Sequence, residues 1–222
     1  MIITPALLEQ TSDLLKKELL ALSPHYSRFQ IDIADNTLVP NTTAQIAELI
    51  DSAFFNVVAD TIFDFHLMVS DPIKHIEMIK NLPKKRIGIV LIHKSVFPNY
   101  SLVTSHYPLI KFGLVLNPED TVESIDEELL KALPSIQVMT IKPGFQGSPF
   151  IPELLNKIEQ LRKRGFKREI LIDGSVNDKT LPTILGKEYK PDVFGVGSFL
   201  TKAKPRQLKK RIEFLKLILS TE

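Results

Sequence analysis

The sequence contains no cysteine among its 222 residues. This absence excludes a disulfide framework, a thiolate nucleophile and any metal site built from thiolates. A chain without cysteine is compatible with a reducing compartment, and we expect a cytoplasmic protein. The amino terminus also lacks the basic segment, apolar core and small-residue cleavage site of a secretory signal.

Long apolar runs are missing as well. No stretch approaches the roughly 18 consecutive apolar residues that a membrane span requires, so we expect no membrane association. The apolar fraction of 44% and the charged fraction of 24% are typical of a soluble globular protein. The formal net charge is only +2, and basic triplets are scattered at residues 84–86, 162–164 and 209–211. A nucleic-acid surface needs basic residues gathered on one face, so we expect no nucleic-acid partner.

Strand-like and helix-like segments alternate along the whole chain, which is typical of βα units and a parallel sheet. Strands are predicted at residues 2–4, 27–34, 63–69, 87–93, 110–116, 136–141, 167–173 and 192–197. Helices are predicted at 11–22, 43–52, 72–81, 121–133, 149–164 and 204–219, with a weakly patterned segment up to residue 107. This α/β pattern predicts a single-domain (β/α)8 TIM barrel over residues 1–222. The alternative is a doubly wound open sheet, but Thr4-Pro5-Ala6-Leu7 does not resemble a Gly-rich dinucleotide turn.

Two aspartates lie at or near the carboxyl ends of predicted strands, Asp32 in the second and Asp173 in the seventh. Those strand ends form one face of a barrel. Chemistry-bearing residues expected around that mouth are Asp32, His66, Met68, His93, Met139 and Asp173. Two carboxylates flanking one carbon can remove a proton from one side and return a proton to the other. The alternative assigns both aspartates to structural hydrogen bonding and His66 to the packed core. The remaining histidines, His25, His75 and His106, are predicted to lie on the surface.

The proposed proton abstraction next to a carbonyl produces an enediolate. A divalent cation held by Asp32, His66 and Asp173 would stabilise its oxygens by several kcal/mol.

Glycines follow three successive predicted strands near the carboxyl end of the chain. The residues are Gly144, Gly147, Gly174 with Ser175, and Gly197 with Ser198. Glycine allows backbone N–H groups to approach an oxyanion closely, and barrels often bind a phosphate in these loops. We therefore expect a phosphorylated substrate, although each glycine taken alone could simply form a turn.

Six segments resemble the motifs of the ribulose-phosphate 3-epimerases. They are residues 32–41, 65–69, 116–119, 139–152, 172–177 and 195–198, spread in order over nearly the whole chain. The resemblance implies a barrel enzyme that interconverts ribulose 5-phosphate and xylulose 5-phosphate, and it suggests a homo-oligomer. It implies that Asp32 and Asp173 act as acid and base around a metal-bound cis-enediolate and that His66 binds the metal ion. Met68 and Met139 correspond to methionines that shield the intermediate, and Gly147, Gly174, Ser175, Gly197 and Ser198 lie on the phosphate loops.

The chain departs from the family pattern beside the aspartates. Gln30 replaces a second metal-ligating histidine, Ala6 replaces a serine, and Ala34 replaces a third shielding methionine. Asn36 and Gln146 replace glycines. An amide oxygen is a harder ligand than imidazole, so we expect weaker metal binding and a shift from zinc or iron toward manganese or magnesium. The small Ala34 predicts extra room above the substrate.

Other functions fit parts of this pattern. Asp173-Gly-Ser175 also resembles the allulose 6-phosphate 3-epimerases, which act on a six-carbon ketose phosphate. The departures at Gln30, Ala6 and Ala34 fit a phosphosugar-binding paralogue that has lost catalysis. Lys142, after the sixth strand, could form a Schiff base in a lyase. Decarboxylases and hexulose-phosphate synthases with an Asp-x-Lys-x-x-Asp strand are disfavoured because 32–35 contains no lysine.

Overall fold

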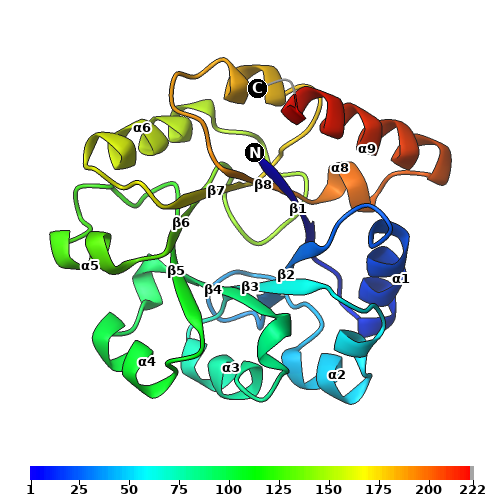
Figure 1. The fold of residues 1–222 in the computed structure, drawn as a ribbon, viewed down its shortest axis with the longest axis horizontal. Coiled ribbons are helices and arrows are strands. Elements are labelled where there is room, and N and C mark those ends of the chain that lie inside the picture. Colours follow the sequence, from blue (N-terminus) through cyan, green and yellow to red (C-terminus); the bar gives the residue numbers. More distant parts are fainter. Residues whose placement is uncertain (221–222) are drawn as a thin grey trace. The chain divides into compact units, whose positions relative to one another are not determined.

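The computed structural model describes residues 1–220, and its strands form one closed parallel barrel in the order β1 to β8 (Figure 1). The predicted (β/α)8 class is therefore confirmed. The strands are β1 (Ile2–Leu7), β2 (Arg28–Ala34), β3 (Ile62–Met68), β4 (Ile87–His93), β5 (Lys111–Leu116), β6 (Ser135–Met139), β7 (Glu169–Asp173) and β8 (Val193–Val196). Two compact units are distinguished, and they are described in turn: Ala6–Val115, and Met1–Pro5 together with the chain from Leu116 onward.

The unit Ala6–Val115 contains β2, β3 and β4 side by side (Figure 1). Its helices are α1 (Ser12–Leu22), α2 (Ile46–Asp51), α3 (Pro72–Ile79) and α4 (Tyr100–His106), with 3-10 turns η1 (Phe54–Asn56), η2 (Lys84–Arg86) and η3 (Lys94–Val96). The α3 helix begins as predicted, because Pro72 suits the first turn and the Asp71 side chain accepts from the Lys74 N–H. α4 lies in the weakly patterned segment that ends at residue 107, where the sequence did not clearly predict a helix. β4 has the predicted bounds, and its last five residues are buried, which fits a strand covered on both faces.

A partly buried ion pair lies at the junction of β3 and β4. Asp64 is fully buried; Oδ2 accepts from Arg28 Nε at 2.7 Å, and Oδ1 accepts from the Ile89 backbone N–H at 2.9 Å. The register between the two strands shifts at this point, between Phe63 and Phe65. Gly88 is required here, because a Cβ atom at this position would lie 2.1 Å from Asp64 Oδ1.

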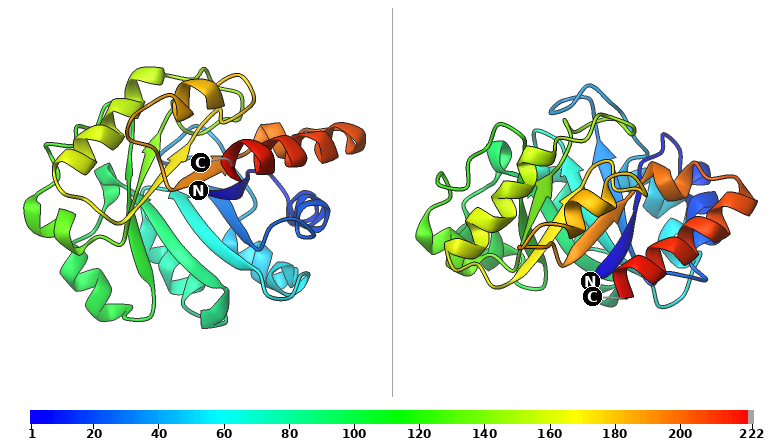
Figure 2. Two further views of the ribbon diagram at one scale, coloured as in Figure 1. Left: turned by 45° about the horizontal axis from the view of Figure 1, so that its top comes forward. Right: turned by 90° about the horizontal axis from the view of Figure 1, so that it is seen from above.

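The second unit contains β6, β7 and β8, and residues 2–5 of β1 pair with β8. Its helices are α5 (Glu127–Ala132), α6 (Asn156–Lys163), α7 (Leu181–Leu185), α8 (Ser198–Thr201) and α9 (Pro205–Ser220), with the 3-10 turn η4 (Pro152–Leu155) before α6. Both views of Figure 2 show the last part of α9 beside the first residues of β1. Within the described range of 1–220, no helix combines the length and apolar character that crossing a bilayer would take.

Several predicted boundaries were wrong. β1 continues to Leu7 rather than ending at Thr4, and Pro5 lies within it as the partner of Val196. The helix predicted at 121–133 is confined to Glu127–Ala132, because the Asp126 side chain accepts from the Leu129 N–H and starts the helix there. The helix predicted at 149–164 is divided into η4 and α6. The predicted domain of residues 1–222 includes 221–222, which lie outside the described residues.

Candidate active site

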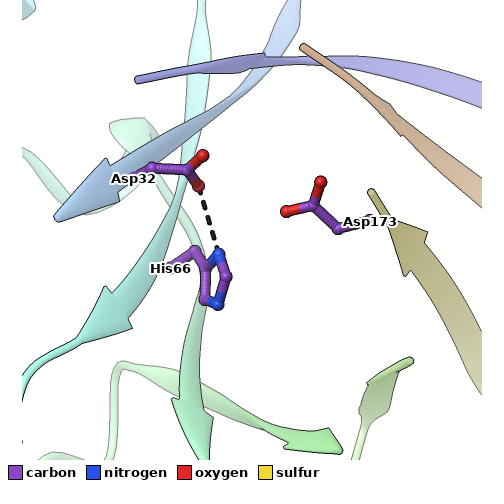
Figure 3. Close-up of side chains that lie close together, drawn as sticks. All are labelled: Asp32, His66 and Asp173. Carbon is purple, nitrogen blue, oxygen red and sulfur yellow. Dashed lines mark hydrogen bonds and ion pairs between the residues drawn. The ribbon is translucent and has the colours of Figure 1, made fainter. Parts of the chain in front are cut away.

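Strand register places Asp32 beside His66. The two residues are Cα partners across β2 and β3, and paired residues of neighbouring strands point to the same face of a sheet. Asp32 is 6% exposed and His66 is 1% exposed. His66 Nδ1 lies 3.2 Å from Asp32 Oδ1 (Figure 3). This contact offsets part of the desolvation cost of burying the carboxylate.

Gln30 provides Asp32 with a second contact. It lies two residues earlier on β2 and, as predicted, shares the face of Asp32. Gln30 Nε2 donates to Asp32 Oδ1 at 2.9 Å and lies 3.5 Å from His66 Nδ1. The group of Gln30 that faces Asp32 is therefore the amide nitrogen, which cannot bind a metal ion. Metal ligation by Gln30 would require its carbonyl oxygen and stays a prediction.

His93 contacts the other side of the His66 ring. The Nε2 atoms of the two histidines lie 2.9 Å apart, and the rings stack with centroids 4.9 Å apart and an interplanar angle of 24°. His93 is fully buried. The sequence predicts His93 at the end of its strand, but this contact depends on strand register and side-chain rotamers, which the sequence does not specify.

Asp173, the last residue of β7, belongs to the other unit and is 9% exposed. Gln137 Nε2, on β6, lies 3.5 Å from both Asp173 Oδ2 and the Met139 sulfur. Thr140 anchors the end of the strand, because its backbone N–H donates to the Asp173 carbonyl oxygen at 2.8 Å. Its hydroxyl donates to the Gly174 carbonyl oxygen at 2.6 Å. Neither contact was predicted from the sequence, because Gln137 lies outside the recognised motifs and Thr140, within the 139–152 motif, was given no role.

Asp32, His66 and Asp173 together could hold a metal ion (Figure 3). Each offers one ligand atom, and these atoms all lie within 4.8 Å of one another. All three residues are buried, so a cation there would compensate carboxylates that water solvates poorly. Two carboxylates and one imidazole form a donor set suited to a divalent ion such as zinc, manganese or iron.

The family model described as the ribulose-phosphate 3 epimerase family matches residues 2–200. This chain belongs to that family. It is 33% identical to the ribulose-phosphate 3-epimerase of Bacillus subtilis over 162 residues, covering 70% of this chain and 71% of that protein. It is 30% identical to the Helicobacter pylori (strain ATCC 700392 / 26695) ribulose-phosphate 3-epimerase over 210 residues, 93% of each chain.

A solved structure of 3-hexulose-6-phosphate synthase from Salmonella typhimurium is similar to this epimerase-family chain in fold. The TM-score is 0.68 with 16% sequence identity, covering 100% of this chain and 99% of the other. At that level of identity the likeness concerns the barrel alone.

The glycines predicted to cradle a phosphate in this ribulose-phosphate 3 epimerase family member fall into two groups. Gly144, Gly147 and Gly174 have φ values of 114°, 84° and 122°, which favour glycine. Gly197 has φ −86°, which lies outside the left-handed region that favours glycine. Ser175 has φ 51°, and its hydroxyl donates to the Ser148 carbonyl oxygen at 2.5 Å, joining the loops after β6 and β7. Phosphate binding by these residues and by Ser198 stays a prediction.

Ala34 does not border open space in this family member. It is fully buried in a cluster with Val39 and Met68, and Leu8 packs against them. Val39 and Met68 therefore occupy part of the space that the missing methionine was expected to leave above the substrate. Ala6 and Met139 are also buried, both at 2% exposure.

Other residues singled out in the sequence differ in exposure. His25, His106 and Lys142 are exposed. The surface prediction for His75 was wrong, because His75 lies on the inner side of α3 beside Ile76 and is 3% exposed. Its Nδ1 lies 3.2 Å from the Asp71 carbonyl oxygen. Asn36 has φ 63°, so this non-glycine residue adopts the left-handed conformation that asparagine tolerates.

Proposed function

We propose that this ribulose-phosphate 3 epimerase family member is a ketose-phosphate 3-epimerase that interconverts D-ribulose 5-phosphate and D-xylulose 5-phosphate. The observation that carries the proposal is the buried group of Asp32, His66 and Asp173, whose ligand atoms all lie within 4.8 Å of one another. Family membership supports the substrate class, since relatives with about 30% identity are named for this reaction.

The reaction inverts one carbon by proton transfer on its two faces. One carboxylate of the pair removes the C3 proton, and the electrons of the C3–H bond move into the enediolate as the C2 carbonyl oxygen becomes anionic. The other carboxylic acid then donates its proton to the opposite face of C3, and the C2 carbonyl re-forms. The reverse reaction exchanges the two roles. Each of Asp32 and Asp173 is therefore the base in one direction and the acid in the other.

Asp32, His66 and Asp173 would hold a divalent ion, which would supply positive charge to stabilise the enediolate oxygens. Gln30 holds the Asp32 carboxylate in place through its 2.9 Å hydrogen bond. Because the chain has an amide where relatives were expected to have a second imidazole, we propose manganese or magnesium rather than zinc or iron.

We propose that the loops after β6, β7 and β8 bind the substrate phosphate. The residues are Gly144, Gly147, Gly174, Ser175, Gly197 and Ser198. Positive φ angles at Gly144, Gly147 and Gly174 support the proposal, since such loops can turn backbone N–H groups toward an anion. Met68 and Met139, both buried, would exclude water from the enediolate.

A pentulose phosphate is favoured over a hexulose phosphate. The packing of Val39 and Met68 against Ala34 supports the smaller substrate, because it fills space that a longer sugar would use. A Schiff-base lyase is not favoured, since Lys142 is exposed and lacks the desolvated pocket that activates a nucleophilic lysine. We also propose a cytoplasmic homo-oligomer without a nucleic-acid partner.

The proposal is tested by metal-dependent turnover. Protein treated with a chelator is reloaded separately with manganese, magnesium, zinc or ferrous iron and supplied with D-ribulose 5-phosphate. Formation of xylulose 5-phosphate with at least one ion is expected, and D-allulose 6-phosphate serves as the six-carbon comparison. Stabilisation of the protein by the sugar phosphate against heat, without turnover under any ion, would instead support the catalytically impaired paralogue.

A further inference from the structure

His93 is a buried histidine that neither the proposed acid-base chemistry nor the metal ligand set uses. It ends β4, and its Nε2 lies 2.9 Å from Nε2 of His66. His93 is fully buried and His66 is 1% exposed. Two neutral imidazoles at this distance share one hydrogen, so one Nε2 must donate and the other must accept.

The state of Nδ1, on the opposite side of the His66 ring, determines whether Nε2 of His66 or Nε2 of His93 donates. Nδ1 of His66 is the atom that faces Asp32, at 3.2 Å from Oδ1. An imidazole nitrogen binds a metal ion through its lone pair and cannot carry a proton there. If Nδ1 binds the ion, the hydrogen of neutral His66 must therefore lie on Nε2. His66 then donates to His93, whose Nε2 must be bare.

The other tautomer of His66 cannot bind the ion through Nδ1. When His66 carries its hydrogen on Nδ1, that N–H can donate to Asp32 Oδ1, and His66 Nε2 accepts from His93. Both arrangements satisfy the 2.9 Å contact between the rings, so the two rings must change tautomer together. The 3.2 Å contact is a hydrogen bond only when Nδ1 of His66 carries the hydrogen; without it, Nδ1 and Asp32 Oδ1 face each other with lone pairs, an arrangement that a bound cation would stabilise.

We propose that His93 is a positioning residue that sets the tautomer and orientation of His66 and so determines how tightly the site binds a divalent ion. The stacked rings, with centroids 4.9 Å apart at 24°, restrict the tilt of His66. The inference rests on the proposed function only in taking this metal site to be the one that epimerisation uses. Partners of metal-binding histidines commonly change metal affinity by about 10- to 100-fold when they are removed.

The test compares two substitutions of His93 by metal titration without sugar. His93→Leu fills the core but cannot accept a hydrogen bond, and we expect its affinity for manganese to fall about 10- to 100-fold. His93→Gln offers an amide oxygen at a similar reach and should restore affinity to within about fivefold of the wild type, since one hydrogen bond is worth roughly 1 kcal/mol. His75→Leu removes a different buried imidazole and should leave the affinity unchanged.

Turnover of the His93→Leu variant should show a lower kcat with little change in KM at saturating manganese, because the predicted phosphate loops are untouched.

Nitrogen NMR of histidine-labelled wild-type protein tests the same inference without a substitution, which covers the case in which His93→Leu does not fold. In the zinc-loaded protein we expect a protonated Nε2 on His66 and an unprotonated Nε2 on His93. A protonated His93 Nε2, equal manganese affinity in the His93→Leu and wild-type proteins, or no ion bound by the wild type would overturn the inference. If manganese affinity depends on His93 as expected but the protein does not epimerise the sugar phosphate, the proposed function would be refuted and the inference would stand.

Discussion

Gln30 Nε2 donates a hydrogen bond of 2.9 Å to Oδ1 of Asp32, so a buried amide supports a carboxylate two residues later on the same strand. The same oxygen lies 3.2 Å from His66 Nδ1. The family resemblance predicts a metal-binding histidine at position 30, but the Gln30 amide nitrogen instead donates to Asp32, which we propose as a metal ligand. This arrangement fits a site in which Gln30, in place of a metal ligand, holds the carboxylate that we propose for catalysis.

Replacing Gln30 separates these two roles. Gln30→Leu removes a donor to a carboxylate, and such hydrogen bonds contribute about 1.5–3 kcal/mol, so kcat/KM should fall by about tenfold or more. Gln30→His adds an imidazole, and we expect divalent ions, zinc above all, to bind at least about tenfold more tightly. Steady-state kinetics and metal titration measure the two effects. Unchanged kcat/KM in Gln30→Leu would contradict the supporting role.

Ser175→Ala should weaken substrate binding without slowing the chemical step. The Ser175 hydroxyl joins the two loops by donating to the Ser148 carbonyl oxygen, and loss of one such bond costs roughly 1 kcal/mol. KM for the sugar phosphate should rise about fivefold while kcat stays near the wild-type value. Ser124→Ala is the control, because that exposed hydroxyl makes a similar bond to the Thr121 carbonyl oxygen. A selective fall in kcat would argue against phosphate binding by these loops.

Gly88→Ala should strongly destabilise the fold. The new Cβ atom would lie 2.1 Å from Asp64 Oδ1, which accepts from the Ile89 N–H. Displacing that buried carboxylate disturbs its ion pair with Arg28, so we expect the free energy of unfolding to fall by about 3 kcal/mol. Gly186→Ala, whose Cβ would lie 3.1 Å from the Pro182 carbonyl oxygen, should cost less than about 1 kcal/mol. Urea unfolding of both variants measures the difference, and equal losses would refute the steric explanation.

Tyr26 should make stability fall at alkaline pH. Burial raises the pKa of Tyr26 to about 12 from its usual value of 10.0. Between those values the unfolded chain loses the phenol proton while the folded chain keeps it, so stability declines as pH rises through that window. Within the described residues its buried hydroxyl has no hydrogen-bond partner, so Tyr26→Phe should gain about 1 kcal/mol at neutral pH. Urea unfolding at pH 7, 10 and 11.5 tests this, and an undiminished alkaline decline in Tyr26→Phe would contradict it.

The barrel fold and the grouping of three site residues could be predicted from the sequence. Alternation of strands and helices predicts the eight-stranded barrel, because short apolar runs alternate with segments of helical periodicity along most of the chain. Asp32, His66 and Asp173 were predicted to lie together, since the carboxyl ends of barrel strands share one face, and their ligand atoms do lie within 4.8 Å of one another.

Side-chain contacts were beyond sequence reasoning. The contact between His66 and His93 depends on register and rotamers, and the space beside Ala34 is filled by Val39 from the following loop. Burial of His75 depends on which side of α3 faces the strands. Such features arise from packing between elements, which the local pattern of apolar residues does not specify.

Solvent deuterium exchange at C3 of the sugar tests the central claim most directly. Ribulose 5-phosphate is incubated in deuterium oxide with metal-loaded protein, and deuterium at C3 of both sugar phosphates is followed by NMR. We expect incorporation by the wild type and its loss in both Asp32→Asn and Asp173→Asn, because an amide neither accepts nor returns the proton. Robust exchange in both variants would contradict catalysis by this pair of carboxylates.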